Sequence, residues 1–332
     1  MPVTLKEVAA KAGVSRSAVS RTFTEGASVS LKTRKKVEKA ANELGYSPNA
    51  LASSLTTGRT KLIGLISNNF HNPLFLEVFD LFTRSLQDRG LRPLLVNLSD
   101  ETDPGNSLRM LRQYSVDGAI VASSTLSPEF SKAFRDARIP VVHSFGRFAN
   151  APYVHVVGID NVECGRMAAR TLIARGYRRI AFMGGPREAT STIDRRAGFL
   201  EVAKATKDIE VSESYATAYS FSAGRTEMQR LLKLDRAEAY FCGDDVLSIG
   251  ALSAIESANL RVPEDIGVIG LNDMEMARWE NINLTTIRQP ISQIISSSIE
   301  LVMAALDDPE RHPEARLFAC EIVERGTLRP TQ

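Results

Sequence analysis

The stretch Ala9–Phe23, with the sequence AAKAGVSRSAVSRTF, places a glycine turn between two short helical patterns. Gly13 can adopt the left-handed conformation that ends a helix, and Ser15 can cap the helix that follows. On this second helix Val19 and Phe23 lie one turn apart and can both face inward. Two short helices joined by such a turn predict a helix-turn-helix unit.

The segments on either side complete a three-helix unit. Thr4 and Glu7 have the spacing of a capping box, and the helix after Thr4 carries an apolar stripe formed by Leu5, Val8, Ala9 and Ala12. A third helix, roughly Lys32–Leu44, has the same spacing of apolar residues at Val37, Ala40, Ala41 and Leu44. An ordinary three-helix surface bundle is the alternative to a helix-turn-helix.

The second helix presents one polar face, formed by Arg16, Ser17, Ser20 and Arg21. The two arginines can reach guanine edges or phosphates in the major groove, and the small side chains beside them allow close approach. Residues 1–60 carry ten Lys and Arg against four Asp and Glu, a net charge of +6, which leaves −4 for the remainder. A basic head on a mildly acidic body indicates that the head binds a polyanion; a solvated basic surface is the alternative.

The next stretch, YSPNALASSLTTGRT at 46–60, contains a short segment of small residues, Asn49–Leu55. A helix this short is marginal in water, so we expect the segment to fold only against another surface. A plain linker is the alternative.

From Lys61 onward, short apolar runs alternate with helical patterns, which predicts parallel sheets covered on both faces. Strands are expected at Leu62–Ile66, Pro93–Val96, Ala119–Val121, Val141–Val142, Ile180–Met183, Tyr215–Ala218, Glu238–Cys242 and Ile266–Gly270. Helices are expected at Leu74–Arg89, Gly105–Tyr114, Pro128–Ala137, Cys164–Arg175, Ile193–Lys204, Ala223–Leu232 and Leu247–Ala258. Two such series predict two doubly wound lobes with a ligand site at the carboxyl ends of the strands.

Other classes of site have little support in the sequence. Cys164, Cys242 and Cys320 have no spacing typical of zinc ligands or of a disulfide framework, and the four histidines form no metal-binding motif. We therefore expect no metal and no cofactor. The N-terminus, MPVTLKEVAAKAG, has no apolar core or cleavage site, and no apolar run is long enough to cross a membrane. These features predict a cytoplasmic protein without a membrane partner.

The chain resembles the lactose/galactose repressor (LacI/GalR) family of bacterial transcription regulators. The motifs that carry the resemblance are VTLKEVAAKAGVSRSAVSR, VSLKTRKKVEKAANELGYSPNALASSLTTGRT, LIGLISNNFHNPLF, GYRRIAFMGGP, VPEDIGVIGLND and LTTIRQP. The resemblance implies an all-α DNA-binding headpiece at 1–47, a hinge helix and linker at 48–60, and a periplasmic-binding-protein-like pair of lobes at 61–332. The lobe near DNA would comprise about 62–158 and 290–318, and the distal lobe about 160–288 and 319–332.

The resemblance also implies the residues that bind DNA and effector. DNA contacts would come from Thr4, Ser15, Arg16, Ser17, Ser20, Arg21, Thr33, Arg34 and Tyr46, and from the hinge residues Asn49, Ala52 and Leu55, with Leu55 entering the minor groove. The effector would contact Asn69, Phe70, Phe75, Asp160, Arg195, Tyr219, Asp244 and Asn272. A planar guanidinium at Arg195 can bind vicinal hydroxyls or a carboxylate with two donors.

Two of these positions depart from the family pattern. The family commonly has Asn-Asp where this chain has Asp244-Asp245, and it commonly has Asp at the position of Asn272. The number of carboxylates is therefore preserved while their geometry is not. For this reason the sugar that one family member binds does not predict the ligand of this chain. Neutral change at the rim of the cleft is the alternative explanation.

These observations predict a sequence-specific DNA-binding transcription regulator, a repressor, controlled by a small polar ligand such as a carbohydrate or sugar acid. Its expected partners are palindromic double-stranded operator DNA and a second copy of the chain. A dimer is expected because the C-terminal sequence ERGTLRPTQ lacks the leucine heptads that tetrameric members add. A carbohydrate transport receptor and a sugar-modifying enzyme are the alternatives. The missing signal peptide and the basic head count against the first, and the absence of a recognisable nucleophile or metal set counts against the second.

Overall fold

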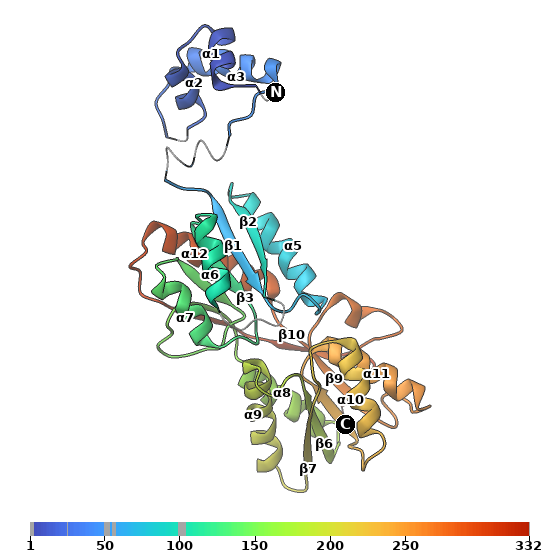
Figure 1. Ribbon diagram of the computed structural model, residues 1–332. Coiled ribbons are helices and arrows are strands. Elements are labelled where there is room, and N and C mark those ends of the chain that lie inside the picture. Colours follow the sequence, from blue (N-terminus) through green and yellow to red (C-terminus); the bar gives the residue numbers. More distant parts are fainter. Residues whose placement is uncertain (1–2, 25, 50–53, 55–57, 99–103, 332) are drawn as a thin grey trace. The chain divides into compact units, whose positions relative to one another are not determined.

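The computed structural model describes residues 3–24, 26–49, 54, 58–98 and 104–331. The chain divides into two compact units, Met1–Lys61 and Leu62–Gln332. Figure 1 shows helices in the described part of the smaller unit and two sheets covered by helices in the larger one. A mixed α/β architecture with an N-terminal helical unit and two sheet lobes confirms the predicted fold class.

The smaller unit packs three helices, α1 (Leu5–Ala12), α2 (Arg16–Thr22) and α3 (Leu31–Leu44), around a small apolar core. The side chains of Val8, Val19 and Val37 are fully buried there. Local sequence signals determine its helix ends. Both bonds of the Thr4–Glu7 capping box are present and Gly13 has a φ of 65°. Ser15 caps α2 by accepting a hydrogen bond from the backbone N–H of Ala18.

The first lobe is a six-stranded parallel sheet in the order β11-β5-β4-β3-β1-β2. Its strands are β1 (Leu62–Ser67), β2 (Arg92–Asn97), β3 (Gly118–Ala122), β4 (Val141–Ser144), β5 (His155–Ile159) and β11 (Ala315–Phe318). Its helices are α5 (Leu74–Gln87), α6 (Pro104–Gln113), α7 (Pro128–Asp136) and α12 (Ile291–Asp307).

The second lobe has the strand order β12-β10-β9-β8-β6-β7, in which only the β10–β12 pair is antiparallel. Its strands are β6 (Arg179–Gly184), β7 (Glu210–Tyr215), β8 (Ala239–Cys242), β9 (Gly267–Asn272), β10 (Thr286–Arg288) and β12 (Glu321–Val323). Its helices are α8 (Asn161–Ala174), α9 (Thr190–Ala205), α10 (Phe221–Leu231), α11 (Asp245–Ser257) and the short 3₁₀ helix η1 (Glu275–Arg278).

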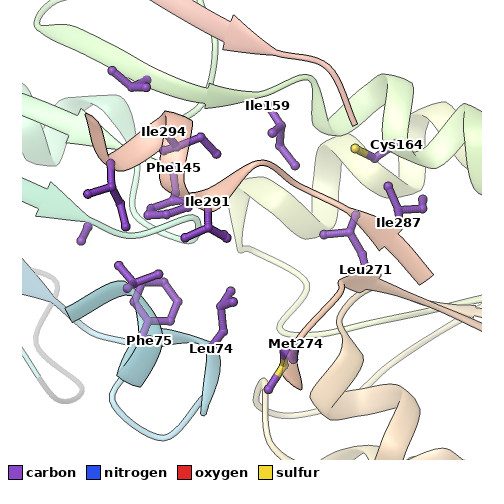
Figure 2. Packing of buried hydrophobic residues seen from close by; sticks show 14 of the residues in the cluster. Leu74, Phe75, Phe145, Ile159, Cys164, Leu271, Met274, Ile287, Ile291 and Ile294 are labelled. Carbon is purple, nitrogen blue, oxygen red and sulfur yellow. The ribbon is translucent and has the colours of Figure 1, made fainter. Parts of the chain in front are cut away.

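Three segments pass between the lobes. They join β5 to α8, β10 to α12, and β11 to β12. One apolar cluster contains residues of both lobes, among them Phe75 and Phe145 of the first and Leu271 and Met274 of the second (Figure 2). Ile287, on the strand that leads into the second crossover, is fully buried in the same cluster. The lobes therefore share part of their hydrophobic core.

Glycines allow two pairs of helices in the second lobe to approach closely. A Cβ atom on Gly198 of α9 would lie 1.8 Å from the carbonyl oxygen of Val162 on α8. A Cβ atom on Gly250 of α11 would lie 2.3 Å from the carbonyl oxygen of Phe221 on α10. Only glycine fits at these positions, because any side chain would overlap a backbone atom.

The structure differs from the expected elements at several places, and β5, β10, β11 and β12 are strands that the apolar runs did not predict. The strand predicted at Tyr215–Ala218 is wrong in position, because β7 runs from Glu210 to Tyr215. This edge strand consists mostly of polar residues and is largely exposed, so it lacks the apolar run of a central strand. The helix α12 was not among the expected helices, although Ile291, Ile294 and Ile295 have helical spacing and are buried.

Candidate functional site

The exposed face of α2 contains the predicted DNA-contacting side chains. Arg16, Ser17, Ser20 and Arg21 are all exposed, whereas Val19 between them is fully buried. Each helix of the unit buries its apolar stripe against the others, so the polar stripe of α2 faces solvent. A helix with this composition, preceded by a glycine turn, is the element that reads the major groove in helix-turn-helix proteins.

Other predicted DNA contacts have structural roles of their own. The guanidinium of Arg34 donates a hydrogen bond of 3.0 Å to the backbone carbonyl of Thr22, the last residue of α2. The ring of Tyr46 packs against Phe23, with centroids 5.8 Å apart. The hydroxyl of Thr33 accepts a hydrogen bond from Ser30, which caps α3. Asn49 is exposed, and the predicted contacts Ala52 and Leu55 lie outside the described residues.

A second candidate site lies between the two lobes, at the carboxyl ends of their strands. Asp244 follows β8 and caps α11, Asn272 ends β9, and Arg195 lies on α9. Leu74, Phe75, Ser124 and Phe145 of the first lobe line the same pocket, together with Ile159, Asn161 and Gln289. Because parallel strands end at one edge of a sheet, residues that are distant in sequence meet here.

Hydrogen bonds connect these polar side chains across the lobes. Oδ2 of Asp244 accepts from Nδ2 of Asn72 at 3.0 Å and from Nδ2 of Asn272 at 2.9 Å. Asn72 belongs to the first lobe and Asp244 to the second, so the first of these bonds joins the two lobes directly. Gln289 on the crossover donates to Oδ1 of Asn272 at 2.6 Å. Within the described part of the chain, the Oε1 atom of Gln289 is buried and has no hydrogen-bond partner.

Arg195 contributes a buried positive charge to the pocket. Its side chain is 3% exposed. Its Nε donates to Asn161 at 2.8 Å and its Nη1 donates to the backbone carbonyl of Gly243. These two bonds hold the guanidinium plane in place, while its charge favours the ionised form of Asp244.

Burial changes the protonation of the adjacent carboxylates. Burial raises the pKa of Asp244 above its ordinary value, against the opposing effect of the Val246 N–H, Arg195 and the two asparagines. Burial likewise raises the pKa of Asp245 to about 7, even though Thr286 and the backbone N–H of Met274 donate hydrogen bonds to it. The two carboxylates therefore tend to bind protons at higher pH than free aspartate does.

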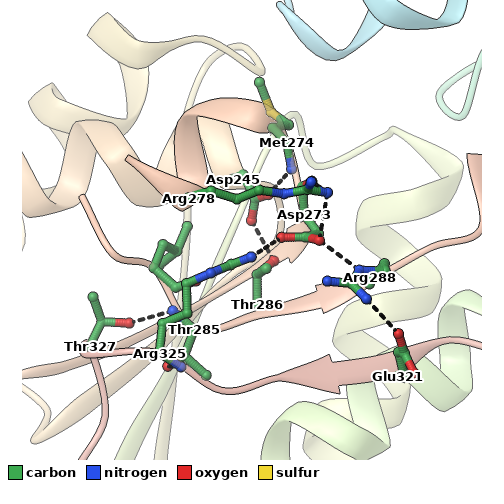
Figure 3. A network of polar contacts seen from close by, with 11 residues as sticks. Asp245, Asp273, Met274, Arg278, Thr285, Thr286, Arg288, Glu321, Arg325 and Thr327 are labelled. Atoms are coloured by element: carbon green, nitrogen blue, oxygen red, sulfur yellow. Dashed lines mark hydrogen bonds and ion pairs between the residues drawn. The ribbon is translucent and has the colours of Figure 1, made fainter. Parts of the chain in front are cut away.

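A charged network supports the strand end on which Asn272 lies. Figure 3 shows Asp273 between Arg278, Arg288 and Arg325, with ion-pair distances of 3.0, 2.6 and 2.5 Å. Burial acts to raise the pKa of Asp273, but the hydrogen bonds from Arg325 and Arg288 outweigh it, so the pKa is lowered. Asn272 and Asp273 have φ values of 132° and 58°. Such left-handed backbone persists only where the surroundings hold it.

The structure brings together four of the eight predicted effector residues, Phe75, Arg195, Asp244 and Asn272. Asn69 and Tyr219 line a separate, wider cavity between the same lobes, with a volume of about 570 Å³. The hydroxyl of Tyr219 hydrogen-bonds to Thr192 at 2.7 Å. Phe70 instead stacks against Phe79, with ring centroids 4.8 Å apart.

Asp160 lies outside this pocket. Asp160 is exposed and caps α8 by accepting a hydrogen bond from the N–H of Glu163. The next residue, Asn161, faces Arg195 in its place. Asn72, Asn161 and Gln289 were not predicted. The only sequence signal for them is that Asn72 lies in the NNFHNP motif and that Asn161 and Gln289 lie at the expected crossovers.

Additional contacts close the lobes around this pocket. The guanidinium of Arg147 in the first lobe pairs with Asp194 on α9 at 2.6 Å. The backbone carbonyl of Ser124 accepts hydrogen bonds from Thr190 and Ser191 of α9. The space left beside Asp244 and Arg195 is only about 10 Å³, which is about the size of one water molecule.

The described residues contain neither a candidate metal site nor a candidate membrane span. No cluster of His, Cys, Asp or Glu there has the arrangement of a metal site. None of the helices described is both long and apolar enough to span a membrane.

Comparisons with known proteins agree with this architecture. Residues 4–49 match the model of bacterial regulatory proteins of the lacI family, and residues 169–328 match that of the periplasmic binding protein-like domain. The HTH-type transcriptional repressor PurR of Pectobacterium carotovorum subsp. carotovorum (strain PC1) is 35% identical over 307 residues, which cover 90% of this chain and 89% of that protein. PurR of Escherichia coli O139:H28 is 33% identical and covers 98% of this chain and 96% of its own length.

Solved structures are similar over the full length. The lac repressor dimer bound to operator and the anti-inducer ONPF has a TM-score of 0.87 at 25% identity, covering 98% of this chain and 99% of that one. The complex of the transcriptional regulator CelR with cellobiose has a TM-score of 0.72 at 28% identity, with the same coverage.

A helix-turn-helix unit followed by two lobes with a polar pocket between them defines the class of DNA-binding transcription regulators with a small-molecule effector domain. Within this class, the chain belongs to the LacI family of bacterial regulatory proteins.

Proposed function

We propose that the chain is a repressor that binds operator DNA through α2 and responds to a small polar ligand bound between its lobes. The observation that carries this proposal is the hydrogen bond between Asn72 and Asp244, which joins the lobes inside the predicted effector pocket. A ligand that binds Asp244 competes directly with Asn72. Ligand binding and lobe arrangement are therefore coupled, and a ligand shifts the arrangement by its differential affinity for the two states.

The pocket chemistry favours a ligand with several hydroxyl groups. Asp244 and the Oε1 of Gln289, which has no partner among the described residues, offer acceptors for hydroxyl donors, while Arg195 offers donors for a hydroxyl or carboxylate oxygen. Phe75 supplies an apolar surface for the C–H face of a sugar ring. A carbohydrate or sugar acid matches this set. Since the space beside Asp244 is about 10 Å³, such a ligand requires the lobes to separate.

On the DNA side, we propose that Arg16, Ser17, Ser20 and Arg21 face the major groove, with Thr4, Ser15, Thr33, Arg34 and Tyr46 near the backbone. Asn49, Ala52 and Leu55 would form the hinge contacts, a role that rests on the family resemblance alone. The proposed domains are a headpiece at 1–47, a hinge at 48–60 and the lobes at 61–332. The lac repressor whose structure is similar was crystallised as a dimer on operator, and we propose the same assembly on palindromic DNA here.

The relatives named above are repressors. We infer that this chain likewise acts by binding, without catalysis, and that it works in the cytoplasm, where operator DNA is accessible. A transport receptor would have no use for the exposed basic face of α2.

The proposed site is tested by measuring how each compound in a panel of sugars and sugar acids changes the affinity of the protein for the DNA that flanks its own gene. We expect an active compound to lose at least tenfold in potency with Arg195→Lys, because the shorter ammonium cannot reproduce the bonds to Asn161 and Gly243. Arg196→Lys is the matched control, since Arg196 pairs with Glu213 at the surface. Equal potency in wild type and Arg195→Lys would show that the effector binds elsewhere.

A further inference from the structure

Two cysteines meet where the chain passes between the lobes. Cys164 lies in the first turn of α8, directly after β5, and Cys320 lies between β11 and β12. β5 and β11 are paired in parallel, with Ile159 opposite Phe318 at their ends. Both chains thus leave the first lobe side by side, and each reaches its cysteine within a few residues. The strand pairing itself brings the two thiols together although they are far apart in sequence.

The two side chains pack into the same apolar cluster. Each thiol is near enough to the other to change its pKa. Cys164 is 1% exposed, while Cys320 is only partly buried and packs against the same cluster. Figure 2 shows Cys164 on the helix that follows the first crossover. The third cysteine, Cys242, is fully buried in a different cluster.

The surroundings give the two thiols different acidities. The neighbouring thiol of Cys164, together with the positive charge of Arg195, lowers the pKa of Cys320, against the effects of burial and Asp160. The Cys320 thiol and burial raise the pKa of Cys164. The more exposed sulfur is therefore the one that more readily becomes a thiolate, which is the reactive form of cysteine.

We propose that Cys164 and Cys320 form a redox modification site that closes to a disulfide when the protein meets hydrogen peroxide. The Cys320 thiolate attacks one peroxide oxygen, which breaks the O–O bond and gives a sulfenic acid and hydroxide. The sulfur of Cys164 then attacks the sulfenic sulfur, the S–S bond forms, and the hydroxyl group leaves as water with the proton of the Cys164 thiol. Two thiols are oxidised by two electrons, peroxide is reduced, and a dithiol reductant reverses the bond by exchange.

The bond would tie the start of α8 to the connection between β11 and β12. Gly165, the neighbour of Cys164, packs so closely against Arg195 that a Cβ atom on it would lie 2.0 Å from the Arg195 carbonyl oxygen. Arg195 lines the effector pocket, so Cys164 lies close to that pocket. A cross-link here restrains two of the three segments that must bend when the lobes move, since each crossover absorbs part of the change.

The proposal is tested by treating the full-length protein with peroxide. Its peptides are then mapped by mass spectrometry under non-reducing conditions. We expect one linked pair of peptides, containing Cys164 and Cys320 and lighter by two hydrogens, which dithiothreitol removes. Cys242→Ser should form the same link. Cys164→Ser should form none, and its Cys320 should be trapped as a sulfenic acid by dimedone.

Absence of the Cys164–Cys320 link in oxidised wild type, or a link through Cys242, would overturn the assignment. So would a Cys320 that stays unmodified in Cys164→Ser. Hydrogen exchange tests the restraint. The oxidised protein should exchange at least several-fold more slowly at 159–165 and 319–322, and unchanged rates there would contradict it. None of these readouts depends on the identity of the effector.

Discussion

Asn272 and Asp244 are hydrogen-bonded to each other, with Nδ2 of the first 2.9 Å from Oδ2 of the second. These are the two positions at which amide and carboxylate are exchanged relative to the family pattern. Their direct contact means that the exchange preserves a donor and an acceptor across one hydrogen bond. The pair is therefore a unit, and a change at one position alters what the other requires.

Exchanging the amide and the carboxylate between these two positions tests whether the two side chains act as a unit. Asn272→Asp alone should destabilise the protein, because it places a second carboxylate against a buried one. Adding Asp244→Asn should recover much of that loss by restoring an amide–carboxylate pair. We expect a coupling free energy of roughly 1–3 kcal/mol in a double-mutant cycle of urea unfolding. Additive free energies of unfolding would show that the two side chains do not act together.

Gly198→Ala should destabilise the second lobe, because the new methyl group would lie 1.8 Å from the Val162 carbonyl oxygen. Forcing α8 and α9 apart should cost about 1–3 kcal/mol of unfolding free energy. Gly243→Ala is the control, since a Cβ there has no neighbour closer than 3.6 Å. Equal effects of the two substitutions, measured by thermal unfolding, would contradict the close packing of α8 and α9.

Asp245 predicts a pH dependence of stability. Burial raises its pKa in the folded state to about 7, above the value of 3.8 for a free aspartate. The folded protein therefore binds this proton more tightly than the unfolded chain does. The resulting stabilisation is complete below pH 3.8 and is lost as the pH rises toward 7. Relative to Asp245→Asn, wild type should lose on the order of 2 kcal/mol of unfolding free energy between pH 5 and pH 8. Parallel pH profiles for the two proteins would refute the assignment.

Alanine substitutions at Arg16 and Arg34 should differ in their effects, because the first changes DNA recognition alone and the second also changes folding stability. Arg16 is exposed, so Arg16→Ala should leave the headpiece stable and weaken binding at one base pair by about 1–3 kcal/mol. Arg34→Ala removes the bond to the Thr22 carbonyl and should lower headpiece stability as well. Competition assays with single-base operator variants measure the first effect. A loss of the same size on every sequence would make Arg16 a phosphate contact instead.

The sequence predicted the headpiece well because its signals are local. The Thr4–Glu7 capping box, the turn at Gly13 and the cap at Ser15 each depend on residues within four positions of one another. The alternation of strands and helices predicted two sheet lobes for the same reason. β7 was misplaced because an exposed edge strand needs no apolar run.

The pocket was harder to predict because it depends on tertiary structure. The bond between Asn72 and Asp244 joins residues 172 positions apart, and no local pattern indicates it. Asp160, which was expected in the pocket, caps α8 and turns outward, while Asn161, the first helical residue, turns inward and accepts a hydrogen bond from Arg195. The apolar runs located the ends of β1, β8 and β9 to within two residues, but the backbone at each end decides which side chain enters the pocket.

The most direct test of the central claim is a gel shift with DNA flanking the protein's own gene, over a range of salt concentrations, with and without polar ligands. A ligand-responsive regulator should bind that DNA at least a thousandfold more tightly than random DNA at physiological salt. At least one sugar or sugar acid should change that affinity. Equal affinity for random DNA, with no response to any compound in the panel, would contradict the account.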